Sequence, residues 1–339
     1  LTEPLFVQII IAMFVAIVWF ALDPLHDGSL KIGDLVAFIE YSFHALLSFL
    51  FLANLFTMYP RTAVSSRRLK EIMDMPISID PNENGVTETA SRGYLEFDNV
   101  TFAYPGETES PVLHNISFQA KPGETIAFIG STGSGKSSLV QLIPRFYDVT
   151  LGKILVDGVD VRDMTQKELR DKLGYVPQKG VLFSGTIDSN IRYGKPEITD
   201  AQVKEAAEVA QATEFIDTKP EKYESPVSQG GTNVSGGQKQ RLSIARAIAK
   251  DPEIFIFDDS FSALDFKTDS QLRKALKEYT KDATTVIVAQ RISTILGADQ
   301  IIVLDDGHMA GIGTHKELMA NCEVYQQIAR SQLSEEELA

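Results

Sequence analysis

Two long apolar segments open the chain. Residues 4–22 carry no charged side chain and one amide, Gln8. As a helix rising about 1.5 Å per residue they extend about 28 Å, close to the thickness of the hydrocarbon core of a bilayer. Residues 35–59 are rich in Phe and Leu and contain Glu40 and His44. We therefore predict two membrane-spanning helices, at about 4–22 and 35–59, joined by a polar loop.

Basic residues predict how these helices are oriented. Four of them follow the second apolar segment, whereas the loop between the segments contains a single lysine or arginine; they are Arg61, Arg67, Arg68 and Lys70 after the segment and Lys31 in the loop. Because lysine and arginine accumulate on the cytoplasmic side, we expect the region after residue 60 in the cytoplasm. No basic stretch precedes residue 4 and no methionine starts the sequence, so we expect a piece of a longer protein rather than a signal peptide.

Beyond the apolar segments the pattern changes to short strands that alternate with helices. Residues 62–73 have a helical composition and continue the second span, and prolines, asparagines and a glycine between residues 74 and 92 mark a linker. Strand-like runs begin at residue 94, and the remainder alternates strand and helix, as in a layered α/β domain. We predict a transmembrane part at 1–73, a linker at 74–92 and an α/β domain at 93–339.

A glycine-rich loop in the α/β part fits the pattern G-x-x-x-x-G-K-[ST] completely, and we name it the phosphate loop. It consists of Gly130, Ser131, Thr132, Gly133, Ser134, Gly135, Lys136, Ser137 and Ser138. It follows the strand-like run 125–129 and precedes a helix-like run, 139–146, which is the context that the motif requires. Glycines allow main-chain N–H groups to approach phosphates, Lys136 is expected to reach the β- and γ-phosphates, and Ser137 to bind Mg²⁺. The other interpretation, a glycine-rich turn without a ligand, requires strand, loop and helix to coincide by chance.

A second strand ends in two carboxylates. The apolar run 254–257 is typical of a buried parallel strand, and Asp258 and Asp259 follow it directly. Ligands bind at the carboxyl ends of such strands, so we expect both carboxylates near the phosphate loop.

Between these two motifs, residues 234–241 read VSGGQKQR, and this run resembles the signature sequence of ATP-binding cassette (ABC) proteins. The resemblance extends over essentially the whole chain, with the motifs in the order of the family, and it is to ABC exporters of the multidrug or lipid type. It implies an α/β P-loop NTPase fold, with an antiparallel β subdomain and a helical subdomain at about 178–249, preceded by two transmembrane α-helices. It also implies ATP and Mg²⁺ as cofactors.

The same resemblance assigns roles to further residues. Tyr104 looks like the aromatic that stacks on adenine, and Gln178 like the glutamine that touches Mg²⁺ and senses the membrane domain. Asp258 corresponds to the strand aspartate at the metal. Asp265 lies in a stretch similar to the loop that crosses the dimer interface. The signature residues that would contact the γ-phosphate of a partner's ATP are Ser235, Gly236, Gly237 and Gln238.

Two positions depart from the family pattern. Asp259 stands where a glutamate usually acts as general base, and its carboxylate is withdrawn by about 1.5 Å. Gln290 stands where a histidine usually faces the γ-phosphate, and a glutamine donates a hydrogen bond but cannot become cationic. Loss of a general base typically slows a reaction about 10²- to 10⁴-fold. We therefore expect that Asp259, Gln290 and Gln178 form a site that hydrolyses ATP poorly; the alternative is two tolerated polar substitutions in a working site.

Cassettes of this family work as head-to-tail pairs, in which each ATP lies between the phosphate loop of one subunit and the signature of the other. An intact signature beside an impaired hydrolytic site therefore suggests one half of a heterodimeric exporter, whose second, non-identical subunit carries the glutamate and the histidine. Residues 1–60 would then be the last two spans of an N-terminally truncated membrane domain. We expect a multi-pass protein of the plasma or inner membrane with a cytoplasmic cassette, in contact with the lipid bilayer and a small hydrophobic substrate.

Composition narrows the partners. The net charge is −14, from 32 Lys and Arg against 46 Asp and Glu, which argues against nucleic acid. The single cysteine, Cys322, cannot form an internal disulfide and fits a reducing cytoplasm. Three alternatives stay open: a homodimeric exporter with slow turnover, a soluble P-loop ATPase acting on protein or DNA with its N-terminal segments as core helices, and a gated channel or receptor built on the same fold.

Overall fold

The computed structural model describes residues 2–79, 81–89, 91–107 and 109–333. The chain divides into two units, Leu1–Ser78 and Ile79–Ala339, and the division falls inside the linker predicted at 74–92. The second is called the α/β unit below.

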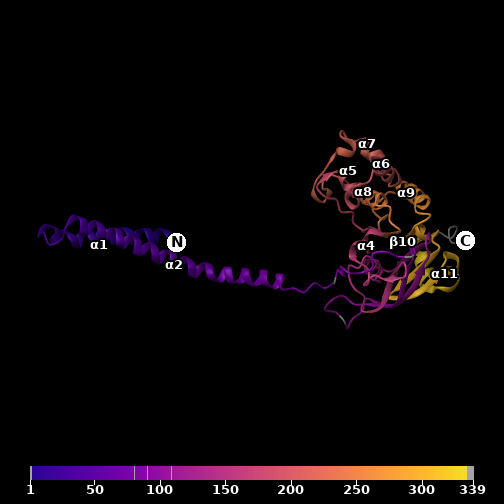
Figure 1. Cartoon of the computed structure of the whole chain (residues 1–339), viewed down its shortest axis with the longest axis horizontal. Helices are drawn as coiled ribbons and strands as arrows, with labels where there is room; N and C mark the ends of the chain where they lie inside the picture. Colours follow the sequence, from indigo (N-terminus) through magenta and orange to yellow (C-terminus); the bar gives the residue numbers. More distant parts are fainter. Residues whose placement is uncertain (1, 80, 90, 108, 334–339) are drawn as a thin grey trace. The chain divides into compact units, whose positions relative to one another are not determined.

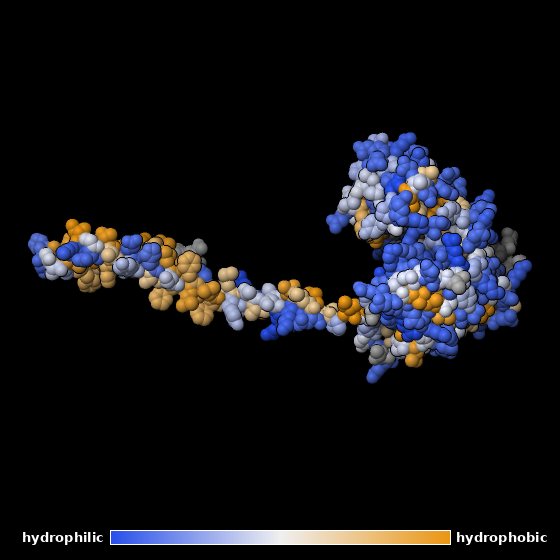
Figure 2. Space-filling view, in the orientation of Figure 1, coloured by the Kyte–Doolittle hydropathy of each residue, from blue (hydrophilic) through white to orange (hydrophobic). Residues whose placement is uncertain are grey.

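The first unit consists of two long helices, α1 (Thr2–His26) and α2 (Ile32–Met73) (Figure 1). They pack against each other, and the rings of Phe14 and Phe43 stack with their centroids 6.3 Å apart. The segments Phe6–His26 and Ile32–Met73 are long and apolar enough to cross a membrane, and neither is buried in the protein. Figure 2 shows hydrophobic residues spread over these helices, whereas hydrophilic residues dominate the visible face of the α/β unit. Uncovered apolar surface of this extent is typical of helices that contact a membrane or another protein.

The α/β unit contains two main sheets. An antiparallel sheet has the strand order β2-β1-β4-β5, and a larger sheet has the order β12-β11-β3-β10-β9-β6, in which β12 is an antiparallel edge strand on otherwise parallel neighbours. The strands of the first sheet are β1 (Leu95–Phe102), β2 (Leu113–Ala120), β4 (Leu151–Val156) and β5 (Val159–Asp160). Those of the second are β3 (Thr125–Gly130), β6 (Leu173–Val176), β9 (Ile254–Asp258), β10 (Thr284–Val288), β11 (Gln300–Asp305) and β12 (His308–Gly313). A short ribbon pairs β7 (Gly185–Thr186) with β8 (Pro226–Val227).

The helices of this unit gather in two places. Figure 1 shows α5, α6, α7 and α8 in one lobe and α11 beside the sheets in the other. The helices are α3 (Lys136–Leu142), α4 (Gln166–Asp171), α5 (Ile187–Ile191), α6 (Asp200–Val209), α7 (Thr213–Asp217), α8 (Gly236–Ala249), α9 (Phe266–Tyr279), α10 (Ile292–Ile295), α11 (His315–Asn321) and α12 (Glu323–Gln332), with 3₁₀ turns at Arg192–Gly194, Lys222–Glu224 and Gln229–Gly231. The helical lobe lies within the region predicted at about 178–249.

The helix after the phosphate loop begins and ends earlier than the run 139–146 predicted from the sequence. It starts at Lys136, directly after Gly135. It ends at Leu142, and Arg145, three residues further on, has a positive φ of 53°, which does not continue a right-handed helix. The last three residues of the phosphate loop, Lys136 to Ser138, therefore form the first turn of α3.

The second half of the predicted linker lies along the α/β unit. The side chain of Asn82 donates a hydrogen bond to the carbonyl of Arg162 at 2.9 Å. Val86 donates its N–H to the carbonyl of Asp163 at 2.8 Å, and Thr165 donates to the carbonyl of Val86 at 3.3 Å. Residues around 82–86 are thus bound to the α/β unit by main-chain pairing, which a composition rich in turn formers did not reveal.

A buried ion cluster ties the two sheets together. The Lys172 ammonium lies 3.0 Å from the Asp157 carboxylate and 3.1 Å from that of Glu253. Asp157 also accepts the N–H of Tyr94, just before β1. Lys172 is only 8% exposed, so little water reaches the cluster. Solvent could therefore not replace one of these charges if it were removed.

Lys172→Met is expected to lower the free energy of unfolding by about 3–5 kcal/mol, because it removes the buried cation between two carboxylates and leaves only the exposed Arg92, 3.5 Å from Glu253. Lys167→Met is the matched control, since Lys167 pairs with Asp171 at 2.7 Å but is fully exposed, and we expect no measurable change. Thermal unfolding of the whole chain in detergent measures both. Equal melting temperatures for the two variants would contradict the assignment of the cluster as a tie between the sheets.

Candidate functional site

Four neighbouring parallel strands end at one edge of the larger sheet. Strands β6, β9, β10 and β3 lie side by side in this order, and each pair is parallel. The phosphate loop follows β3, Asp259 follows β9, Gln290 follows β10, and Gln178 follows β6. This edge therefore collects residues that are more than one hundred positions apart in the sequence.

A cavity of about 240 Å³ opens at this edge. It is lined by Val112, Thr132, Gly133, Gly135, Lys136, Ser137, Ser138, Gln178, Asp259, Val288 and Gln290. The structure thus brings most of the phosphate loop together with Asp259, Gln290 and Gln178, the three residues predicted to be catalytic.

Two glycines of the phosphate loop are required by their neighbours. Gly135 has φ +95°, and a Cβ atom there would lie 2.7 Å from the side chain of Leu113. A Cβ atom on Gly130 would lie 2.0 Å from the carbonyl oxygen of Leu304 on β11. Only glycine permits this close approach, so the loop can turn directly from β3 into α3. The N–H groups at the start of α3 then have no partner within the helix and face the cavity as donors for an anion.

The Lys136 side chain turns back toward the first half of the phosphate loop. Its ammonium donates hydrogen bonds to the carbonyls of Gly130 at 2.8 Å and Ser131 at 2.7 Å, and to the hydroxyl of Ser134 at 3.2 Å. Burial lowers the pKa of Lys136, and the nearby carboxylates of Asp259 and Asp258 oppose that shift. A partly desolvated cation is therefore held within reach of the cavity.

The first strand carboxylate contacts the phosphate loop directly. The Ser137 hydroxyl donates to Asp258 Oδ1 at 2.9 Å, and the Tyr175 hydroxyl donates to Asp258 Oδ2 at 3.3 Å. Burial raises the pKa of Asp258, and these two hydrogen bonds oppose the shift. A hydroxyl and a carboxylate side by side are the hard oxygen ligands that Mg²⁺ prefers in phosphate sites, so the two residues fit the predicted metal role.

Tyr175 was not predicted as a site residue. It lies on β6 opposite Ile256 of β9, two residues before Asp258. Burial, more than the neighbouring Asp258, raises the pKa of its hydroxyl, which therefore stays protonated and can act only as a neutral donor to that carboxylate. Adjacent parallel strands bring their last residues together, so knowledge that β6 pairs with β9 would have placed Tyr175 near Asp258. That pairing was not evident from the sequence.

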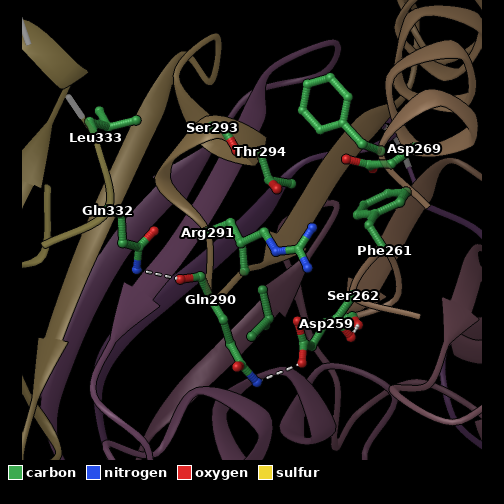
Figure 3. A pocket seen from close by; sticks show the side chains of 13 residues that line it. Asp259, Phe261, Ser262, Asp269, Gln290, Arg291, Ser293, Thr294, Gln332 and Leu333 are labelled. Atoms are coloured by element: carbon green, nitrogen blue, oxygen red, sulfur yellow. Dashed lines mark hydrogen bonds between the residues drawn. The ribbon is translucent and has the colours of Figure 1, made fainter. Parts of the chain in front are cut away.

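Asp259 is hydrogen-bonded to both of the other residues predicted to be catalytic, Gln290 and Gln178. Its Oδ2 atom accepts one hydrogen bond from Gln290 Nε2 at 2.7 Å (Figure 3). It accepts another from Gln178 Nε2 at 3.0 Å. Burial raises the pKa of Asp259, and the Gln178 amide is the strongest of the contacts that oppose this shift. The two positions that depart from the family pattern, Asp259 and Gln290, are therefore in direct contact.

The backbone at Asp259 is also unusual. Its φ is +47°, in the left-handed region, and its N–H donates to the carbonyl of Val288 on β10 at 3.0 Å. Short polar side chains such as aspartate tolerate this region better than longer ones. An aspartate thus suits the turn that leads out of β9, which the sequence did not indicate.

Tyr104 contacts the phosphate loop by its hydroxyl and the core by its ring. Its hydroxyl lies 2.8 Å from the Ser138 hydroxyl. Its ring packs edge-on against Phe102 and Tyr147, with centroids 4.9 and 5.1 Å away. The lining of the cavity does not include Tyr104. Its stacking on adenine stays a prediction.

The signature lies apart from the cavity of its own chain. Ser235 caps α8 in a reciprocal pair of bonds, in which Gln238 N–H donates to the Ser235 hydroxyl and Ser235 N–H donates to the Gln238 amide oxygen. Ser235 and Gly236 are exposed. Among the described residues, the cavity lining contains none of the four predicted signature contacts, so Gly237 and Gln238 are outside it too.

Asp265 is likewise outside the cavity. It caps α9 by accepting the Thr268 N–H at 3.0 Å and the Thr268 hydroxyl at 2.7 Å. These hydrogen bonds lower the pKa of Asp265. The structure therefore gives this carboxylate a local role as a helix cap, and its predicted role at a dimer interface stays untested.

A larger cavity, of about 510 Å³, adjoins Asp259 and Gln290 (Figure 3). Its other lining residues come from the loop after β9, from α9, from the segment around α10 and from the end of α12: Phe261, Ser262, Phe266, Asp269, Val288, Ala289, Arg291, Ser293, Thr294, Gln332 and Leu333. Figure 3 shows the Arg291 side chain extending into this space. Asp259 is thus bordered by cavities on two sides.

Comparisons with known proteins agree with these features. The model of the ABC transporter family matches residues 113–262. The uncharacterized ABC transporter ATP-binding protein YfiB of Bacillus subtilis is 41% identical over 338 residues, covering 99% of this chain and 58% of that protein. The putative multidrug export ATP-binding/permease protein YgaD of the same organism is 43% identical over 293 residues, covering 86% of this chain and 50% of that protein.

A solved structure is similar as well. A bacterial Atm1-family ABC exporter with ATP bound superimposes with a TM-score of 0.76 and 36% sequence identity, over 90% of this chain and 54% of that one. The chain thus spans between half and three fifths of these relatives. The phosphate loop, the strand carboxylates and the signature occur together with these similarities, and the chain belongs to the ABC transporter family.

Proposed function

We propose that the chain is the cassette-bearing end of one half of a membrane exporter driven by ATP. Support comes from the ABC ATP-binding domain, from the two uncovered apolar helices, and from the multidrug export name of a relative. A small hydrophobic or amphipathic substrate suits such a function. The basic residues that follow the second apolar segment, in the last part of α2, favour a cytoplasmic cassette in a multi-pass protein of the plasma or inner membrane.

We propose further that ATP and Mg²⁺ bind at the edge of the larger sheet. Lys136 and the N–H groups of the phosphate loop would hold the phosphates, and Ser137, Asp258 and Gln178 would hold the metal. Bound Mg²⁺ would neutralise charge on the β- and γ-phosphates. The phosphate oxygens of the nucleotide would supply further ligands, as is usual for Mg²⁺ in nucleotide sites.

The hydrolytic activity of this site is proposed to be weak. The observation that carries this proposal is the double hydrogen bond to Asp259 Oδ2 from the Gln178 and Gln290 amides. Hydrogen bonds to the charged carboxylate oppose the rise in its pKa that burial causes, so Asp259 is a weaker base than burial alone would make it. Neither amide can become cationic to compensate for charge that develops on the γ-phosphate. The site suits retention of ATP better than its hydrolysis.

A non-identical partner subunit follows from this proposal. Ser235 and Gly236 of the signature are exposed and do not line the cavity of their own chain, as expected if the signature completes the site of another cassette. That other site needs a functional base, so the partner is proposed to carry the glutamate and the histidine that this chain lacks. A homodimer with slow turnover at Asp259 is the alternative that the experiments below distinguish.

Lys136→Ala is expected to weaken ATP binding to this chain by at least about a hundredfold, because the γ-phosphate would lie uncompensated in a partly desolvated site. Titration of the whole chain in detergent with a fluorescent ATP analogue measures the affinity. Lys153→Ala is the control, since Lys153 pairs with Asp98 on the antiparallel sheet. An unchanged affinity in Lys136→Ala would refute the assignment of the phosphate loop.

Ser235→Ala is expected to reduce hydrolysis at the partner's site more than ATP binding at this one. The variant also removes a helix cap, which by itself costs about 1 kcal/mol. Thr199→Ala is therefore a matched control, because Thr199 makes the same reciprocal cap with Gln202 at the start of α6. Phosphate release and nucleotide binding are measured in the assembled transporter. Equal losses at both sites, or an equal loss in Thr199→Ala, would count against a signature that acts on the partner.

Asp259→Glu alone is expected to raise turnover at this site only partly, whereas adding Gln290→His should raise it by more than the two separate effects combined. The two side chains touch and act on one transition state, so their effects are not independent. Phosphate release is measured in the transporter whose partner has its own catalytic glutamate changed to glutamine. Robust hydrolysis by the unmodified chain in that background would refute the weak site and favour the homodimer.

A further inference from the structure

The last residue of α12 reaches back to the loop that carries Gln290. The Gln332 amide nitrogen donates a hydrogen bond to the main-chain carbonyl of Gln290 at 2.8 Å. The Gln332 amide oxygen accepts the main-chain N–H of Ile292 at 2.9 Å. One side chain thus holds the main chain on both sides of Arg291, and Figure 3 shows the bond between Gln332 and Gln290 at the border of the larger cavity.

These two bonds satisfy groups that the loop cannot pair by itself. Arg291 is extended, with φ −107° and ψ 128°, and it precedes the short helix α10 without capping it through its side chain. The first N–H of a helix has no partner within the helix. Gln332 supplies that partner from a helix forty residues away in the sequence. The main chain of Gln290 is restrained by the same amide.

The restraint continues to the carboxylate. The Gln290 side chain leaves the restrained main chain and donates to Asp259 Oδ2 at 2.7 Å. A continuous series of hydrogen bonds therefore links Gln332, Gln290 and Asp259. We propose that Gln332 is a positioning residue for the ATP site, which fixes the loop after β10 so that the side chain at position 290 faces the γ-phosphate and Asp259. This inference rests on the proposed function of that site.

A role for Gln332 in merely docking α12 is less consistent with the structure. The helix is already anchored by Tyr325 and Ala329, which are both fully buried in a core with Ile292 and Ile295. Gln332 itself is exposed. The Gln332 amide therefore orients the loop around Arg291 and contributes little apolar contact to the packing of α12. We expect α12 to stay folded in place when the amide is removed.

The test compares Gln332→Met with Gln326→Met in the assembled transporter whose partner has its own catalytic glutamate changed to glutamine, so that turnover reports on this site. Methionine keeps the length of the side chain and removes both hydrogen bonds. Gln326 lies on the same helix, and its amide donates to the carbonyl of Met319 at 2.9 Å, outside the site. We expect Gln332→Met to lower kcat for ATP about 2- to 10-fold, as the loss of one or two hydrogen bonds implies, with KM unchanged because the phosphate loop is untouched. Gln326→Met should leave both parameters unchanged.

Hydrogen exchange at the main chain provides a second measurement. The Ile292 N–H should exchange faster with solvent in Gln332→Met and at the original rate in Gln326→Met. If exchange at Ile292 does not change, or if both variants lower kcat to the same extent, Gln332 does not position the loop. An unchanged kcat in Gln332→Met would overturn the proposal in the same way.

A second background separates this inference from the proposed weakness of the site. Both hydrogen bonds that the Gln332 amide makes with the described residues go to main-chain atoms, so Gln332→Met should lower kcat by the same factor in the Asp259→Glu, Gln290→His variant. In that variant, turnover does not depend on the contact between the native Asp259 and Gln290 side chains. A robust rate in the unmodified chain would refute the weak site yet leave the comparison of Gln332 and Gln326 intact. A loss confined to one background would contradict a restraint that acts through the main chain.

Discussion

The parallel order of β6, β9, β10 and β3 is the constraint on which the site depends. Because parallel neighbours end at the same edge, the phosphate loop, the strand carboxylates, Gln178 and Gln290 come together although they are distant in sequence. The glycines at positions 130 and 135 then allow the loop to pass close to Leu304 and Leu113. A change of strand order would separate the cation, the carboxylates and the amides, even with every motif intact.

Charge is unevenly balanced at this edge. The single ammonium of Lys136 faces the carboxylates of Asp258 and Asp259, and burial lowers the pKa of the first and raises the pKa of the other two. A nucleotide adds further negative charge, which a divalent cation can offset. Gln290 offers a hydrogen bond where a histidine could offer a positive charge, and it uses that bond on Asp259. Glutamine at position 290 therefore orders the carboxylate but supplies no positive charge to the γ-phosphate.

Several residues of the family motifs also stabilise the fold of their own chain. Ser235 and Asp265 cap helices, and Tyr104 packs against the core through its ring. These contacts hold the motifs in fixed positions before any partner or nucleotide arrives. A cap that is exposed at a helix N-terminus leaves its N–H groups directed outward, which suits an anion presented by another molecule. Stability of the fold and presentation to a partner are therefore compatible in the same residues.

The sequence by itself determined the phosphate loop, the buried strand that ends at Asp258, the helix from Gly236 to Ala249 and the two long apolar helices. Each rests on a local pattern: a glycine spacing, an unbroken apolar run, or a run of uncharged residues as long as a bilayer is thick. It also identified Asp259 and Gln290 as departures from the family pattern.

Only the tertiary structure decided that these two side chains touch, that Tyr175 contacts Asp258, and that Gln332 holds the main chain around Arg291. Such contacts depend on strand order and on the position of a terminal helix, which are set by the packing of residues far apart in the chain and leave no periodic trace in the sequence.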